Sequence, residues 1–135
     1  MAKKRRVKGG RMEEKFKVLI VDDDTKFCQT LRDILEEENF FVDEAHNGEE
    51  AHEIMKKGLN TLIFLDIKMP GFDGFLTSVL VGKNRPGTKL IFVTGYQEEE
   101  GVKKLLGAIP QSSWLKKPVD PGEVIKIAKH HREKL

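Results

Sequence analysis

The 135-residue sequence has only one cysteine, Cys28, which excludes an internal disulfide and makes core packing the expected role of that side chain. It also lacks any apolar run near the roughly 20 residues that a membrane-spanning helix needs. The basic N-terminus is not followed by the apolar segment of a signal peptide. These absences predict a cytoplasmic protein that does not enter the membrane.

Positive charge is concentrated at one end of the chain. Residues 1–11 hold six of the 24 lysines and arginines and no acidic residue, so the remainder has 18 basic and 22 acidic residues, a formal charge of −4. We therefore expect a basic, disordered tail over residues 1–15 and one folded domain over residues 16–135. The folded part has no basic patch with interleaved aromatic residues, which argues against nucleic-acid binding.

Five short segments have the composition of β-strands. Three of them are continuous apolar runs, which are typical of strands buried on both faces of a parallel sheet. Two are more polar and suit the edges of a sheet. The apolar runs are Val18–Val21, Leu62–Leu65 and Leu90–Val93, and the more polar segments are Phe40–Ala45 and Ser112–Lys116.

Helical patterns follow each of these segments. Two of the helices have clear start signals, Asn47 with Glu50 three residues later and Asp120 followed by Pro121. The alternation of strands and helices predicts an α/β protein with a doubly wound (βα)₅ three-layer fold and right-handed crossovers. The three buried and two edge strands fit a parallel sheet in the order 2-1-3-4-5.

Polar side chains follow four of the predicted strands at their carboxyl ends. Asp22 and Asp23 follow the first strand, Asp66 the third and Thr94 the fourth, and Lys117 comes after the fifth. The carboxyl ends of parallel strands meet at one edge of the sheet, and the first and third strands are neighbours at its switch point. We therefore expect these side chains to converge, with Asp66 at the mouth of the sheet beside Asp22 and Asp23, where it need not be buried.

Three carboxylates in one cleft repel one another, and a hard divalent cation such as Mg²⁺ would relieve this repulsion. A metal, a lysine, a hydroxyl and a carboxylate nucleophile are the parts of a phosphoryl-transfer site that forms an acyl phosphate. Each residue alone has an ordinary explanation, as a helix cap, a turn hydroxyl or a surface lysine. Suitable residue types at all four strand ends together favour one phosphoryl-transfer site over four unrelated explanations.

Four segments, taken in order, resemble the receiver domain of two-component response regulators. They are "VLIVDDD", "LDIKMPGFDG", "FVTGY" and "WLKKPVD", and the resemblance covers roughly residues 16–134. It implies that Asp66 is the phosphoacceptor. It also implies that Asp22 and Asp23 bind Mg²⁺, together with Asp66 and the backbone carbonyl of Lys68.

The resemblance assigns roles to further residues. It implies that Thr94 is the switch hydroxyl and that Lys117 binds the phosphoryl group, with a cis peptide bond to Pro118. Trp114 stands at the switch aromatic position, where the family usually has tyrosine or phenylalanine. Tyr96 and Pro118 are expected to line the site, and Lys68 and Tyr96 are expected to lie near the phosphoryl group.

The resemblance also implies partners. The phosphoryl group would come from a sensor histidine kinase or a histidine phosphotransfer protein, and the signal would pass to a downstream protein. The only catalysis expected is the chain's own phosphorylation and dephosphorylation, so it would not be a turnover enzyme. No output domain is expected after Leu135, so the signal would pass by contact between proteins; the alternative is a receiver domain cut from a longer protein.

The residue types alone leave three other functions open. The stretch "DDDT" matches the nucleophile motif of haloacid-dehalogenase-type phosphatases, in which Asp22 would attack, but the second acidic pair of such enzymes is missing after the fourth strand. A flavodoxin-like FMN binder would need a Gly/Ser/Thr-rich loop where this chain has carboxylates. A receiver-like binding module that is not phosphorylated is the third alternative.

Overall fold

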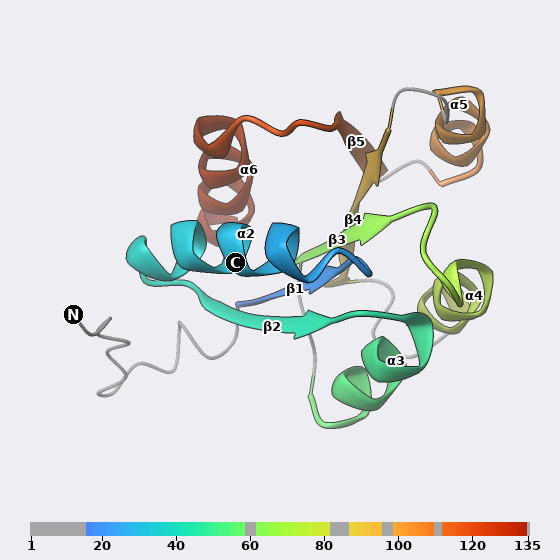
Figure 1. Cartoon of the computed structure of the whole chain (residues 1–135), viewed down its shortest axis with the longest axis horizontal. Helices are drawn as coiled ribbons and strands as arrows, with labels where there is room; N and C mark the ends of the chain where they lie inside the picture. Colours follow the sequence, from blue (N-terminus) through green and yellow to red (C-terminus); the bar gives the residue numbers. More distant parts are fainter. Residues whose placement is uncertain (1–15, 59–61, 82–86, 96–98, 110–111, 135) are drawn as a thin grey trace.

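The computed structural model describes residues 16–58, 62–81, 87–95, 99–109 and 112–134 (Figure 1). The strands are β1 (Lys17–Val21), β2 (Phe41–Ala45), β3 (Leu62–Asp66), β4 (Lys89–Thr94) and β5 (Ser112–Lys116). The helices are α2 (Thr25–Glu37), α3 (Gly48–Lys56), α4 (Phe72–Val81), α5 (Glu99–Ala108) and α6 (Pro121–Glu133). The predicted basic tail over residues 1–15 lies outside the described residues and stays a prediction.

The strands form one parallel sheet in the order β2-β1-β3-β4-β5, as the hydrophobic pattern predicts. Each strand is followed by a helix, so the (βα)₅ interpretation is confirmed. None of the described helices is both long and apolar enough to span a bilayer.

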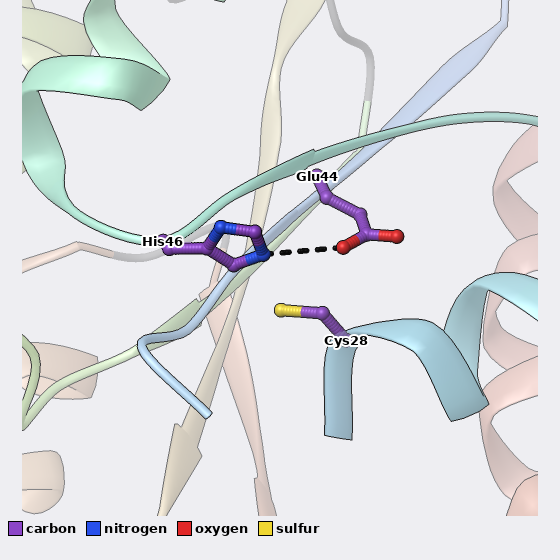
Figure 2. Close-up of side chains that lie close together, drawn as sticks. All are labelled: Cys28, Glu44 and His46. Atoms are coloured by element: carbon purple, nitrogen blue, oxygen red, sulfur yellow. Dashed lines mark hydrogen bonds and ion pairs between the residues drawn. The ribbon is translucent and has the colours of Figure 1, made fainter. Parts of the chain in front are cut away.

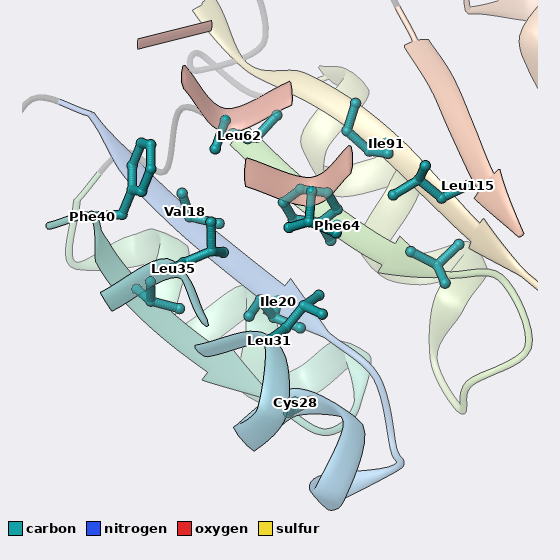
Figure 3. Packing of buried hydrophobic residues seen from close by; sticks show 14 of the residues in the cluster. Val18, Ile20, Cys28, Leu31, Leu35, Phe40, Leu62, Phe64, Ile91 and Leu115 are labelled. Atoms are coloured by element: carbon teal, nitrogen blue, oxygen red, sulfur yellow. The ribbon is translucent and has the colours of Figure 1, made fainter. Parts of the chain in front are cut away.

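Side chains that alternate along the central strands fill two separate hydrophobic cores. Val18 and Ile20 of β1 pack on the side covered by α2 and α6, and Figure 3 shows this cluster between the strands and those helices. Leu19 and Val21 pack on the opposite side, under α3, α4 and α5. Because both faces of the sheet are covered, the central strands are continuous apolar runs and do not alternate with polar residues.

Side chains that cap helix N-termini determine where the loops at the carboxyl edge of the sheet end and the helices begin. Asp24 is the N-cap of α2 and accepts hydrogen bonds from the backbone N–H groups of Lys26 and Phe27, both at 3.1 Å. Asn47 and Asp120 cap α3 and α6, as their start signals predict. With α2 beginning at Thr25, only three aspartates separate it from β1, so two of them remain for the site.

Candidate functional site

Three carboxylates converge where β1 and β3 end. The two strands are neighbours, and the pairing of Val21 with Leu65 brings the following residues side by side. One carboxylate oxygen each from Asp22, Asp23 and Asp66 lies within 4.8 Å of the other two. The predicted convergence is therefore confirmed for these three carboxylates.

Asp66 is buried, which corrects the expectation that it escapes burial at the mouth of the sheet. Only 6% of its surface is exposed. The pairing of β3 with β4 continues one residue past the strand, because Ile67 N–H donates to the Val93 carbonyl at 3.2 Å. Asp66 therefore remains within the sheet, although it is the last residue of its strand.

The environment of Asp66 disfavours its negative charge. Burial raises the pKa of its carboxyl to about 6, while the Lys68 backbone N–H, which donates to Oδ1 at 3.0 Å, lowers it. The neighbouring Asp22 carboxylate raises the pKa further, and the Lys117 ammonium partly opposes this. An additional cation at the cluster would favour the charged form.

Lys117 reaches this cluster from the opposite end of the chain. Its Nζ lies 2.9 Å from Oδ2 of Asp22 and 4.5 Å from the centre of the Phe27 ring. Its backbone N–H donates to the Thr94 carbonyl at 2.9 Å, and the peptide bond to Pro118 is cis, as the resemblance implies. Burial lowers the pKa of the ammonium, but the hydrogen bond and charge of Asp22 outweigh burial and raise it.

The remaining predicted residues occupy different surroundings. Thr94, the last residue of β4, is fully buried, and its Oγ1 donates to the Gly95 carbonyl at 3.0 Å. Trp114 is partly exposed in β5 and packs against the core under α3, α4 and α5. Lys68 and Pro118 are exposed, and Tyr96 lies outside the described residues, so its expected place at the site stays a prediction.

The acidic cluster fits a hard divalent cation. Oδ2 of Asp22 is buried and, among the described residues, has no hydrogen bond of good geometry, although the Lys117 ammonium lies close by. A buried anionic oxygen that the Lys117 ammonium approaches at 2.9 Å, next to two further carboxylates, matches the oxygen ligands that Mg²⁺ takes in proteins. The exposed Asp23 leaves one side of the cluster open to solvent.

Two features of the site are missing from the sequence interpretation. One is the contact of Lys117 with Phe27, whose place in an apolar helical stripe indicates core packing alone. The other is a groove of about 490 Å³ beside Lys117, lined mainly by apolar side chains of α2 and of the segment after β5, including Ile34 and Val119. Neither feature has a local sequence signal, because each joins residues far apart in the chain.

Comparison with known proteins identifies the family. The family profile described as the response regulator receiver domain matches residues 18–129. This chain belongs to the response regulator receiver family. The receiver domain is the phosphoacceptor of two-component signalling, and the alternatives of a haloacid-dehalogenase-type phosphotransferase and of a binding module that is not phosphorylated are not favoured.

Its relatives include both short and long proteins. The receiver is 37% identical over 112 residues to the transcriptional regulatory protein ResD of Bacillus subtilis, covering 81% of this chain but 45% of ResD. It is 40% identical over 91 residues to the chemotaxis protein CheY of Halobacterium salinarum, covering 67% of this chain and 76% of CheY. The chain thus spans less than half the length of ResD and most of the length of that CheY.

A solved structure supports the same fold. The CheY-like response regulator receiver domain protein from Methanospirillum hungatei JF-1 superimposes with a TM-score of 0.74 and 32% sequence identity. The match covers 88% of this chain and 94% of that one. The likeness therefore extends over nearly the whole domain and is not limited to the site motifs.

Proposed function

We propose that this receiver accepts a phosphoryl group on Asp66. Mg²⁺ would be held by the carboxylates of Asp22, Asp23 and Asp66 and by the backbone carbonyl of Lys68. The observation that carries the proposal is the meeting of these three carboxylates within 4.8 Å, with the Lys117 ammonium 2.9 Å from one of them. A site of this composition has a nucleophile and the positive charge that a transferred phosphoryl group requires.

The geometry suggests which oxygen attacks. The Lys68 backbone N–H donates to Oδ1 of Asp66, and this contact orients the carboxylate and leaves Oδ2 to act as the nucleophile. An Oδ2–phosphorus bond would form as the phosphorus–nitrogen bond of a phosphohistidine breaks, and the electron pair of that bond would pass to the imidazole nitrogen. Bound Mg²⁺ supplies positive charge to the phosphoryl oxygens.

Lys117 and Thr94 would respond to the new phosphoryl group. The Lys117 ammonium is already held at the site by Asp22, so it needs only to exchange one anionic oxygen for another. The Thr94 hydroxyl now donates to the Gly95 carbonyl, and rotation of its side chain would direct it to a phosphoryl oxygen. Trp114, partly exposed in the neighbouring strand, would report this change on the surface that binds the downstream partner.

The proposal includes partners and location. The phosphodonor would be a sensor histidine kinase or a histidine phosphotransfer protein, and the target would be a downstream protein in the cytoplasm. Relatives that are named a transcriptional regulator and a chemotaxis protein indicate that receivers of this kind serve different outputs. The chain would act as a signalling acceptor whose own chemistry is limited to gaining and losing one phosphoryl group.

Asp66→Asn tests the assignment of the nucleophile. The protein is incubated with acetyl phosphate and Mg²⁺, and the phosphoryl group is located by mass spectrometry and by its sensitivity to hydroxylamine. We expect the wild type to be labelled on Asp66 and the variant to be unlabelled, because an amide cannot form the acyl phosphate. A chelator should also stop labelling of the wild type.

Asp73→Asn is the matched control, because Asp73 lies exposed on α4. This variant should be labelled like the wild type. Labelling of Asp22 instead would indicate the phosphatase-type alternative, and a wild type that takes up no label from acetyl phosphate or from phosphoramidate would indicate a binding module. Labelling of the Asp66→Asn protein at the wild-type rate would contradict the assignment.

A further inference from the structure

A second group of potential metal ligands lies between α2 and the end of β2. In the sheet, β2 pairs with β1 on the edge opposite to β3, the strand that carries Asp66. Figure 2 shows the sulfur of Cys28 close to the His46 ring and the Glu44 carboxylate. One ligand atom from each of the three residues lies within 4.8 Å of the other two. The Nε2 atom of His46 is 3.2 Å from Oε1 of Glu44.

The three side chains differ in access to solvent. Cys28 is fully buried, whereas 16% of the Glu44 side chain and 36% of the His46 side chain are exposed. An ion could therefore enter from the His46 side and find the sulfur at the inner end. Core packing accounts for the burial of Cys28 but not for the meeting of a thiol, an imidazole and a carboxylate.

Surrounding residues hold two of these ligands in position. Arg32 donates to Oε2 of Glu44 at 3.1 Å, which leaves Oε1 directed toward His46. Glu50 accepts a hydrogen bond from the His46 backbone N–H at 2.7 Å, and its Oε1 lies 3.6 Å from Nδ1 of the ring. Metal-binding histidines commonly direct their second ring nitrogen to a carboxylate in this way.

We propose that Cys28, Glu44 and His46 form a Zn²⁺ site, with Sγ, Oε1 and Nε2 as ligands and water at the fourth position. Sulfur, imidazole nitrogen and carboxylate oxygen are the three ligand types that zinc takes in proteins. In a tetrahedral site with ordinary zinc–ligand lengths the ligand atoms lie roughly 3.3–3.6 Å apart. Side-chain movements on the order of 1 Å would bring the present cluster to that geometry.

The charges of this group balance a divalent ion. A thiolate and a carboxylate carry two negative charges, the imidazole ligates in its neutral form, and the charge of Arg32 beside Glu44 is matched by its second ion pair, with Glu36. In the metal-free protein, burial and the nearby Asp22 and Glu44 carboxylates raise the pKa of the thiol to about 12. Binding of Zn²⁺ must therefore displace the thiol proton to solvent, and the charge of the ion reverses the local repulsion that opposes this loss.

The proposed zinc site is joined to the acidic cluster through one contact. The Cys28 thiol donates to the backbone carbonyl of Asp22 at 3.3 Å, so Cys28 adjoins the residue that links β1 to the loop before α2. The ligands are nevertheless different: the cluster around Asp66 has only oxygen ligands and suits Mg²⁺, whereas the sulfur and nitrogen ligands favour zinc. This difference allows the two sites to be titrated separately.

Cobalt spectroscopy tests the proposal. Protein without an affinity tag is treated with a chelator, saturated with Mg²⁺ to occupy the acidic cluster, and titrated with Co²⁺. We expect a near-ultraviolet thiolate-to-cobalt charge-transfer band that saturates at one equivalent and is removed by Zn²⁺. Cys28→Ala should lose the band, and Glu44→Gln and His46→Gln should weaken Zn²⁺ affinity by about tenfold or more.

His52→Gln is the control, because His52 lies exposed on α3 and outside the proposed site. It should bind Zn²⁺ like the wild type. His46 is partly exposed, so His46→Gln tests the proposal even if Cys28→Ala does not fold. The proposal is overturned if the wild type shows no charge-transfer band, or if His46→Gln or Cys28→Ala binds Zn²⁺ as tightly as the wild type.

Discussion

Burial of the Asp66 carboxyl conflicts with the negative charge that its proposed chemistry needs when no metal is bound. Its carboxyl group is buried at the end of a central strand, and a second buried carboxyl, that of Asp22, lies next to it. Burial disfavours the charged form that the proposed chemistry needs. The proposed site for a cation and a phosphoryl group therefore lowers the stability of the protein when neither is bound.

This loss of stability predicts that Asp66→Asn stabilises the metal-free protein at neutral pH. The amide keeps the shape of the side chain and can accept from Lys68 N–H, but it removes the buried charge. A shift of the pKa from 3.8 to about 6 corresponds to about 3 kcal/mol at most, and we expect a gain of about 2 kcal/mol at pH 7. Urea unfolding in the presence of a chelator measures it.

The same shift sets the pH dependence of this gain. Because the pKa of Asp66 is higher in the folded than in the unfolded chain, the proton it takes up stabilises the fold fully below pH 3.8, and this stabilisation is lost as the pH rises through about 6. The advantage of Asp66→Asn should therefore shrink between pH 7 and pH 4. An advantage that is the same at both pH values would mean that the buried charge is not its cause.

Among the elements, α3 and the loop after β3 meet through two glycines. The Gly48 N–H donates to the Pro70 carbonyl at 3.1 Å, and a Cβ on Gly48 would collide with the Gly71 carbonyl oxygen. Gly71 itself has φ +81°, a conformation that favours glycine. The loop so held carries Lys68, whose N–H binds Asp66, so helix packing and site geometry are connected here.

Gly48→Ala should therefore destabilise the protein by about 1–3 kcal/mol, because the added methyl group meets backbone that cannot rotate away. Urea unfolding measures the change, and the rate of labelling by acetyl phosphate should fall in parallel as the loop shifts. Gly74→Ala in α4 is the matched control, since a Cβ there meets no atom within 4 Å. Equal unfolding midpoints for Gly48→Ala and the wild type would contradict the contact.

For the whole molecule, cation binding and folding are linked. The three carboxylates come from segments that only the folded sheet brings together, so the cation should bind the native chain and not the unfolded one. A ligand at about 100 times its dissociation constant stabilises the native state by roughly 2.7 kcal/mol. The melting temperature should thus rise with Mg²⁺ concentration.

Thermal unfolding in Mg²⁺ and in a chelator tests this linkage. Asp23→Asn should abolish most of the rise, because it removes one ligand while leaving the buried core unchanged. Glu49→Gln, from an exposed acidic group on α3, should keep the wild-type response. A rise of equal size in Asp23→Asn would place the stabilising cation elsewhere on the chain.

Local patterns in the sequence determined the architecture of this protein. Continuous apolar runs such as Leu62–Leu65 mark strands covered on both faces, and the caps at Asn47 and Asp120 mark helix starts, because both signals depend on residues close together in the chain. Which runs are most apolar then indicates which strands are central and which lie at the edges of the sheet, and the order 2-1-3-4-5 fits that division. The convergence of Asp22, Asp66 and Lys117 could be predicted for the same reason, since parallel strands share one carboxyl edge.

Only the tertiary structure decided how these side chains are packed. The burial of Asp66 depends on pairing that continues through Ile67, and the 2.9 Å contact of Lys117 with Asp22 joins opposite ends of the chain. The meeting of Cys28 with His46 likewise depends on how α2 lies against β2. Periodicity and capping report the surroundings of each segment along the chain, whereas exposure, pKa and ligand geometry depend on distances between segments that only packing sets.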